Sequence, residues 1–170
     1  MSEPRVPGPT ARLAFRPWTE GDLSLARELF GEPKVTALVG GPFDHTAIAD
    51  RLAFELGNQR DHGIAYWPVL MGGREIGCCG LKPRDPARRV HELGFYFLPA
   101  YWGQGLAPEA GASVVAFAFD VLGCTGLFAG HHPENHGSRR ALEKLGFRYV
   151  HHELYPPTGL QHPCYELPRP

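Results

Sequence analysis

The chain has 170 residues, with 17 Lys and Arg against 18 Asp and Glu, so its formal net charge is −1. This length predicts one domain that can bury a core, and 43% hydrophobic with 21% charged residues excludes an intrinsically disordered chain. The balanced charge argues against a nucleic-acid binder with a broadly basic surface, and no apolar run approaches the ~18 residues of a membrane span. The four cysteines form no CxxC pair, which indicates a reduced, cytoplasmic protein.

The first elements follow a proline-rich start. Residues 1–10 have no apolar core, so we expect a short disordered lead and a single domain over residues 11–170. Alternating side chains predict a strand over residues 12–18. Thr19 is the expected cap of a helix that runs to about residue 30.

The middle of the chain changes from a helical to an extended period. Asp44 is a candidate cap for an amphipathic helix, because Ile48, Leu52 and Leu56 then share one face. Turn residues such as Gly72-Gly73 separate three predicted strands, at residues 65–71, 74–81 and 90–98.

The last part alternates helices with strands. The pattern predicts helices over residues 106–122 and 135–145, the second ended by Gly146 as a left-handed cap. Strands are expected at residues 126–129, 148–155 and 163–167. Strands joined by turns pair antiparallel, and a strand–helix–strand unit gives a parallel crossover. The sequence therefore predicts an α/β fold: a mixed sheet of six to seven strands, mostly antiparallel, with helices on both faces.

The most informative stretch lies between the strand at residues 90–98 and the next helix. Gly103 and Gly105 stand just before the helix, where free N–H groups and the helix dipole favour an anion such as a pyrophosphate. Pro108 fits a dinucleotide fingerprint poorly, and the Gly-Lys-Ser/Thr of a Walker loop is missing. A plain turn is the alternative at this point.

Two blocks of the sequence resemble one known family. Residues 101–110, YWGQGLAPEA, look like the coenzyme A pyrophosphate loop of the GNAT superfamily of acetyl-CoA-dependent N-acetyltransferases. Residues 132–138, HPENHGS, and 142–147, LEKLGF, are similar to a second block of the branch that includes the RimJ and RimL ribosomal-protein acetyltransferases. The resemblance covers about residues 11–167, with both blocks in the family's order and spacing.

The resemblance implies a GNAT-like fold whose fourth and fifth strands splay apart, with acetyl-CoA as cosubstrate and no metal. The pantetheine arm would lie along free backbone groups of Phe97 and Leu98, and Asn135 would also bond it. The pyrophosphate would be held by amides of the loop and first helical turn, at Gly103, Gln104, Gly105, Leu106 and Ala107.

The reaction needs a base for the amine and a proton for the thiolate. Glu92 is the candidate base, since alternation puts it on the face of Gly94 and Tyr96, and His91 is its rival. A solvated or arginine-paired carboxylate is the alternative. Leu142 stands where many members have a tyrosine acid, so the resemblance suggests Ser138 near the sulfur, although Ser138 could equally be only a helix cap.

Several functions stay open from the sequence. The expected activity is N-acetyl transfer, by direct attack in a ternary complex, to a protein N-terminus or a small-molecule amine. The alternatives are a non-catalytic coenzyme A-binding module and a nucleotide-binding α/β protein. The nine histidines show no zinc-like spacing. We expect no nucleic-acid or membrane partner, and a homodimer could form through an edge strand near the C-terminus.

Overall fold

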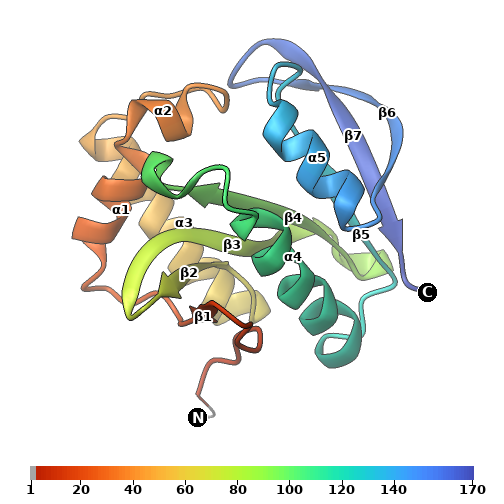
Figure 1. Cartoon of the computed structure of the whole chain (residues 1–170), viewed down its shortest axis with the longest axis horizontal. Coiled ribbons are helices and arrows are strands. Elements are labelled where there is room, and N and C mark those ends of the chain that lie inside the picture. Colours follow the sequence, from red (N-terminus) through yellow and green to blue (C-terminus); the bar gives the residue numbers. More distant parts are fainter. Residues whose placement is uncertain (1–2) are drawn as a thin grey trace.

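A seven-stranded sheet runs through the molecule in the order β1-β2-β3-β4-β5-β7-β6 (Figure 1). The structure is a computed structural model that describes residues 3–170. The strands are β1 (Leu13–Phe15), β2 (Tyr66–Met71), β3 (Arg74–Asp85), β4 (Val90–Phe97), β5 (Gly126–Gly130), β6 (Arg148–Tyr155) and β7 (Leu160–Pro168). All neighbouring pairs are antiparallel except β4 and β5, which are parallel, so the predicted mixed sheet is confirmed.

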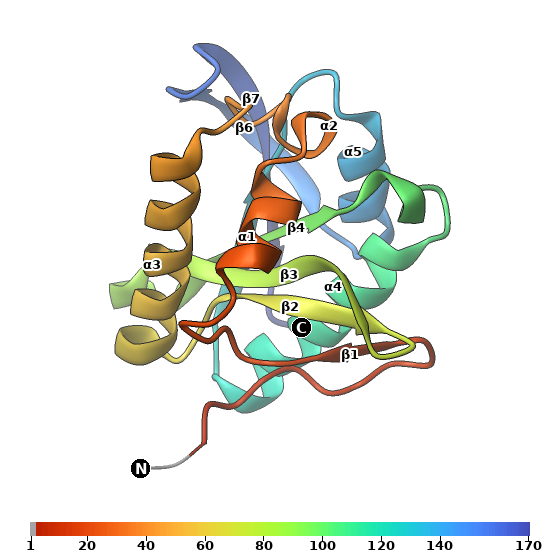
Figure 2. The same cartoon turned by 90° about the vertical axis from the view of Figure 1, so that its left-hand side faces the viewer.

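Helices cover both faces of this sheet. Figure 2 shows α1 and α3 on one side, and α4 and α5 on the other. The bounds are α1 (Leu23–Phe30), α2 (Pro33–Thr36), α3 (His45–His62), α4 (Leu106–Ala116) and α5 (His136–Lys144). Single turns of 3-10 helix lie at Pro86–Arg88 and Pro99–Tyr101, and a π turn at Phe117–Val121 continues α4. Within the described chain, every helix is too short or too polar to span a bilayer.

The first helix begins later than the sequence predicts. Asp22, not Thr19, is the N-cap, and its carboxylate accepts hydrogen bonds from the Thr19 N–H at 2.8 Å and from Arg16. The ion pair with Arg16 turns the carboxylate back toward the preceding strand, so residues 19–22 form a separate turn. Asp44 caps α3 as predicted, accepting from the Ala47 N–H at 2.8 Å.

The proline-rich start follows the outside of α4. Residues 1–2 lie outside the described part of the chain. Val6 packs against the core, and the Gly8 carbonyl accepts a hydrogen bond of 2.6 Å from Ser113 Oγ. At residues 6–10 the proline-rich start therefore has defined contacts with α4 and the core, whereas the domain bounds expected from the sequence remain a prediction.

Strands β4 and β5 pair only at their beginnings. The parallel register runs from Val90 with Gly126 to Glu92 with Phe128, whereas β4 continues to Phe97 and β5 to Gly130. On its other side β4 stays paired with β3 as far as Phe97. The two strands therefore part inside the sheet, and the gap that they leave positions the functional site.

A buried ion pair links α3 to the sheet on the α1 side. Glu55 is 0% exposed, and its carboxylate accepts from Arg51 Nε at 2.9 Å and from the Tyr66 N–H at 2.8 Å. The Arg51 guanidinium also lies 4.7 Å from the ring centroid of Phe30 and 5.5 Å from that of Tyr96. The aromatic rings and one carboxylate together compensate a desolvated cation.

We predict that Glu55→Leu destabilises the fold by about 3–5 kcal/mol, because it leaves the Arg51 charge and the Tyr66 N–H without an acceptor. Urea denaturation followed by circular dichroism measures the free energy of unfolding. Glu143→Leu is the control, since its pair with Arg139 has the same spacing on the exposed face of α5. Equal losses for the two variants would contradict the role assigned to the buried pair.

Candidate active site

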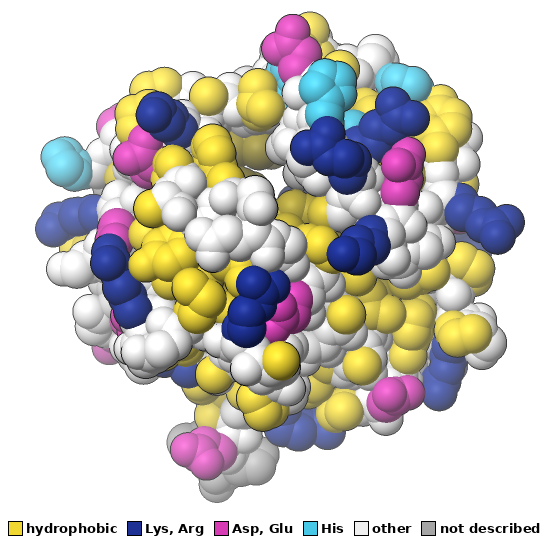
Figure 3. All heavy atoms as spheres, in the orientation of Figure 1, with side chains coloured by type: hydrophobic (Ala, Val, Ile, Leu, Met, Phe, Trp, Pro, Cys, Tyr) yellow, Lys and Arg dark blue, Asp and Glu magenta, His cyan; other side chains and the backbone are white. Residues whose placement is uncertain are grey.

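A cleft of about 1000 Å³ opens where β4 and β5 part, and Figure 3 looks onto its mouth. The first turns of α4 and α5 bound one end of the cleft, and α2 with the β6–β7 hairpin bounds the other. Eight of the ten residues predicted for the site line it: Glu92, Phe97, Gly103, Gly105, Leu106, Ala107, Asn135 and Ser138. Leu98 and Gln104 do not.

The predicted anion loop has the backbone that such a site requires. Gly103 and Gly105 both adopt left-handed conformations, at φ 75° and 74°, which a residue with a Cβ rarely adopts. Gly105 is the N-cap of α4, so the N–H groups of Leu106 and Ala107 belong to the first helical turn and have no acceptor within the helix. Their direction and the helix dipole favour a bound anion.

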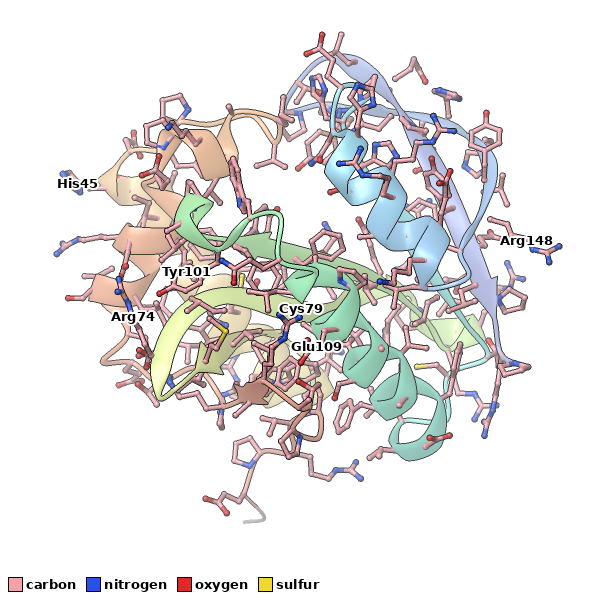
Figure 4. The ribbon with its side chains drawn as sticks, in the orientation of Figure 1. His45, Arg74, Cys79, Tyr101, Glu109 and Arg148 are labelled. Carbon is pink, nitrogen blue, oxygen red and sulfur yellow. The ribbon has the colours of Figure 1, made fainter. Side chains whose placement is uncertain are left out.

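The N-terminal segment fastens this loop from outside. Glu109, labelled in Figure 4, accepts from Thr10 Oγ1 at 2.7 Å and from Arg12 Nε at 2.7 Å. Arg12 also donates to the Gln104 carbonyl at 3.0 Å. The hydrogen bonds from Thr10 and Arg12 hold the pKa of the Glu109 carboxyl below its usual range. We call Thr10, Arg12 and Glu109 the loop clamp.

The backbone of β4 offers different groups from those that the sequence indicated. The Leu98 N–H donates to the Ile76 carbonyl at 2.9 Å, and the Leu98 carbonyl accepts from the Tyr101 N–H. The expectation that Leu98 has free backbone groups is therefore wrong, because β3 pairing extends one residue past β4. Alternation directs the backbone of Phe95 and Phe97 away from β3, into the cleft, where the Phe97 carbonyl accepts from Trp102 Nε1 at 2.7 Å.

Glu92 lies in the cleft near Tyr66, Tyr96 and Tyr155. Its Oε1 is 3.5 Å from Lys82 Nζ, and the rings of Tyr66 and Tyr96 are 6.1 Å apart on the same face. Burial, with Glu92 nearby, raises the pKa of Tyr66 well above its usual value, so its hydroxyl stays neutral. The rival His91 does not line the cleft, which favours Glu92.

The second block forms the start of α5. Asn135 is the N-cap, and its Oδ1 accepts from the Ser138 N–H at 3.0 Å. Ser138 is therefore not the cap that was its alternative role. Ser138 lines the cleft, as does Asn135. Leu142 is buried below them, so its position brings no hydroxyl to the site.

Sequence reasoning missed a group of buried histidines on the far wall. His132 Nδ1 accepts from the Glu134 N–H at 3.0 Å, which places the ring proton on Nε2. The His132 and His162 rings are 5.5 Å apart, and His162 stacks on Tyr155 at 4.6 Å. No local pattern in the sequence reports this group, because His132 follows the end of β5 and His162 comes from β7.

One set of donor atoms has the spacing of a metal site but not its chemistry. Donor atoms of His151, Glu153 and Cys164 lie within 4.8 Å of one another. Arg84 Nη2, however, lies 2.5 Å from Glu153 Oε1, and burial raises the pKa of the Cys164 thiol to about 11. A guanidinium at the carboxylate and a neutral thiol both oppose a cation.

We predict that Glu109→Gln raises the KM for acetyl-CoA roughly three- to tenfold with kcat unchanged, the effect of weakening charge-assisted hydrogen bonds behind the loop. Steady-state kinetics at saturating amine measures both constants. Glu28→Gln is the matched control, because Glu28 pairs at 3.6 Å with Arg74, which Figure 4 shows at the left-hand edge of the molecule, away from Glu109. A lowered kcat at constant KM would contradict the role of the clamp.

We expect His131 to make the stability of the fold depend on pH. Its Nδ1 donates to the His132 carbonyl at 2.7 Å and its Nε2 accepts from the Tyr165 hydroxyl at 3.1 Å, and burial lowers its pKa. The neutral ring is thus favoured in the folded state, so its contribution is present above the unfolded pKa of about 6.5 and is lost as pH falls below it. We predict that the drop in thermal midpoint from pH 7.5 to 5.5 is smaller in His131→Gln. An unchanged drop would refute this assignment.

Comparisons with known proteins agree with this geometry. Residues 12–148 match the family model described as an acetyltransferase (GNAT) domain. The uncharacterized N-acetyltransferase YoaA of Bacillus subtilis (strain 168) is 29% identical over 143 residues, which cover 82% of this chain and 81% of YoaA.

Solved structures share the fold over nearly the whole chain. An acetyltransferase from Agrobacterium tumefaciens str. C58 superposes with a TM-score of 0.82 at 24% identity, covering 99% of this chain and 98% of that one. The spermidine N-acetyltransferase of Vibrio cholerae, in complex with CoA and spermine, gives a TM-score of 0.78 at 16% identity and covers 93% and 96% of the two chains. With its parted strands and glycine loop, the chain belongs to the GNAT acetyltransferase family and is an N-acetyltransferase that uses acetyl-CoA.

Proposed function

We propose that the cleft transfers the acetyl group of acetyl-CoA to a primary amine by direct attack in a ternary complex. The observation that carries this proposal is the convergence of the anion loop, the free β4 backbone and Glu92 on one cleft. The diphosphate would bind at Gly103 and Gly105 and at the first turn of α4. The pantetheine would then run between β4 and β5, pairing with the backbone of Phe95 and Phe97.

Glu92 is the proposed base. A primary ammonium must lose a proton before it attacks, and a carboxylate in a cleft lined by tyrosines can take that proton directly or through a water molecule. Attack gives a tetrahedral intermediate whose oxygen carries negative charge. The Phe95 N–H, which β4 directs into the cleft, is the proposed donor to this oxygen, so that the Phe95 carbonyl and the Phe97 backbone remain for the pantetheine.

Ser138 is the proposed neighbour of the leaving sulfur. As the tetrahedral intermediate collapses, the C–S bond breaks and the thiolate takes up a proton. Ser138 lines the cleft at the start of α5, and the helix dipole there also favours the anion. Leu142 offers no hydroxyl that could protonate the thiolate, and this absence is what favours the alternative of a non-catalytic coenzyme A-binding module. The turnover measurement below separates the two.

We also infer the finer features that the sequence indicated. The two motif blocks support the RimJ/RimL-like branch, whose acceptors include protein N-termini as well as small-molecule amines. The four cysteines are free and buried, which supports a cytoplasmic location. A homodimer would use the edge strand β6, which exposes Tyr149, Val150 and Leu154.

We predict that Glu92→Gln lowers kcat about 10²–10⁴-fold near neutral pH while the Kd for acetyl-CoA changes little, because only proton transfer is lost. Thiol release with a panel of amines gives kcat, and calorimetry gives Kd. Glu28→Gln, outside the cleft, should behave as the wild type. Unchanged turnover in Glu92→Gln would remove Glu92 from the mechanism, and binding of acetyl-CoA without turnover by the wild type would favour the non-catalytic module.

A further inference from the structure

The half of the cleft farther from the anion loop is lined by paired charges and apolar side chains, unlike the half at the loop. We call it the acceptor end, bounded by α2, by β4 at Glu92 and by the β6–β7 hairpin. Its role depends on the proposed function, because the acceptor end is where that reaction would receive its amine.

Both carboxylates of the acceptor end are already paired with cations. Glu92 faces Lys82 at 3.5 Å, and Glu153 faces Arg84 at 2.5 Å. Lys34, on α2, adds a further positive charge to the lining. Glu134, the remaining acidic residue of the lining, stands at the start of α5, beside the cofactor half. Because Glu153 is held by Arg84 at the shorter distance, this end offers an incoming ammonium at most the carboxylate of Glu92.

The remaining walls of the acceptor end are apolar. α2 and the turn after it contribute Val35, Leu38 and Val39, and β6 contributes Leu154 and Tyr155. These two walls meet where the backbone of Gly40 lies against Pro157, since a Cβ added at Gly40 would be 2.7 Å from Pro157 Cβ. The contact bounds the acceptor end, whose walls on α2 and β6 add aliphatic and aromatic side chains to the paired charges.

The rings around Glu92 also carry no charge. Burial raises the pKa of Tyr155 to about 12, with Tyr96 and Glu92 close enough to contribute. One ammonium can thus be held by Glu92 and by the faces of neutral tyrosines. A second ammonium farther along the same molecule would face Lys34, Arg84 or an aliphatic wall.

We propose that the acceptor is a primary amine with a single positive charge and an apolar body, rather than a polyamine or an aminoglycoside. Each additional ammonium of a polycation would lose its hydration without gaining a carboxylate, and it would meet like charges. The apolar body of a monoamine would instead cover Val35, Leu38 and Leu154.

The test compares phenethylamine with spermidine and ribostamycin on the coenzyme A-loaded wild type, for binding, and with acetyl-CoA, for kcat/KM. We expect phenethylamine to exceed both polycations at least tenfold in affinity and in kcat/KM. A preference for spermidine or ribostamycin, or equal values, would overturn the inference. Tighter binding of phenethylamine without acetylation of any amine would support the acceptor class and refute the proposed function, so the two failures are distinguishable.

A charge variant tests the cause of the preference. Arg84→Met frees Glu153 and should raise the affinity for spermidine relative to phenethylamine at least fivefold. Lys82→Gln, which frees Glu92, should shift the same ratio in the same direction and serves if Arg84→Met does not fold. Arg74→Met, remote from the cleft, should leave the ratio unchanged. A ratio that stays constant in the folded cleft variants would overturn the inference.

Discussion

The parting of β4 and β5 after Glu92 and Phe128 is the constraint on which the site depends. Interior strands of a sheet normally satisfy their backbone groups on both sides. Here β4 stays paired with β3 as far as Phe97, and β5 stays paired with β7 as far as Gly130. Beyond Glu92 and Phe128, however, β4 and β5 no longer pair with each other. The polar groups left facing the gap suit a ligand with amide groups of its own, such as a pantetheine arm. A closed sheet would have neither the gap nor the free groups.

The surrounding elements hold that gap open and close its ends. Gly111 of α4 allows the helix to approach α5, since a Cβ there would be 2.6 Å from a methyl group of Leu145. The loop clamp joins residues about a hundred positions apart and stabilises the glycine turn from its outer side. At the other end, Arg51 and Glu55 support Tyr66 and Tyr96 beneath Glu92. At the anion loop the cleft thus presents mainly backbone groups to a ligand, whereas at the acceptor end it presents mainly side chains.

Much of this fold could be predicted because local patterns carry it. Alternation over residues 90–98 and the motif before α4 were sufficient to place Glu92, Gly103 and Gly105 around one cleft. The failures involve contacts between distant residues. The occupied N–H of Leu98 follows from the β3 register, and the clamp at Glu109 joins it to Arg12, 97 positions earlier in the chain. No local pattern reports such pairings. The cap at Asp22 is a nearer case, set by an ion pair with Arg16 six positions earlier.

A crystal structure with bound coenzyme A tests the central claim most directly. We expect the diphosphate against the N–H groups of Gly103, Gly105 and Ala107, with the pantetheine amides paired to Phe95 and Phe97 between the parted strands. A diphosphate bound elsewhere, or β4 and β5 paired beyond Glu92 and Phe128 in that crystal, would contradict the claim.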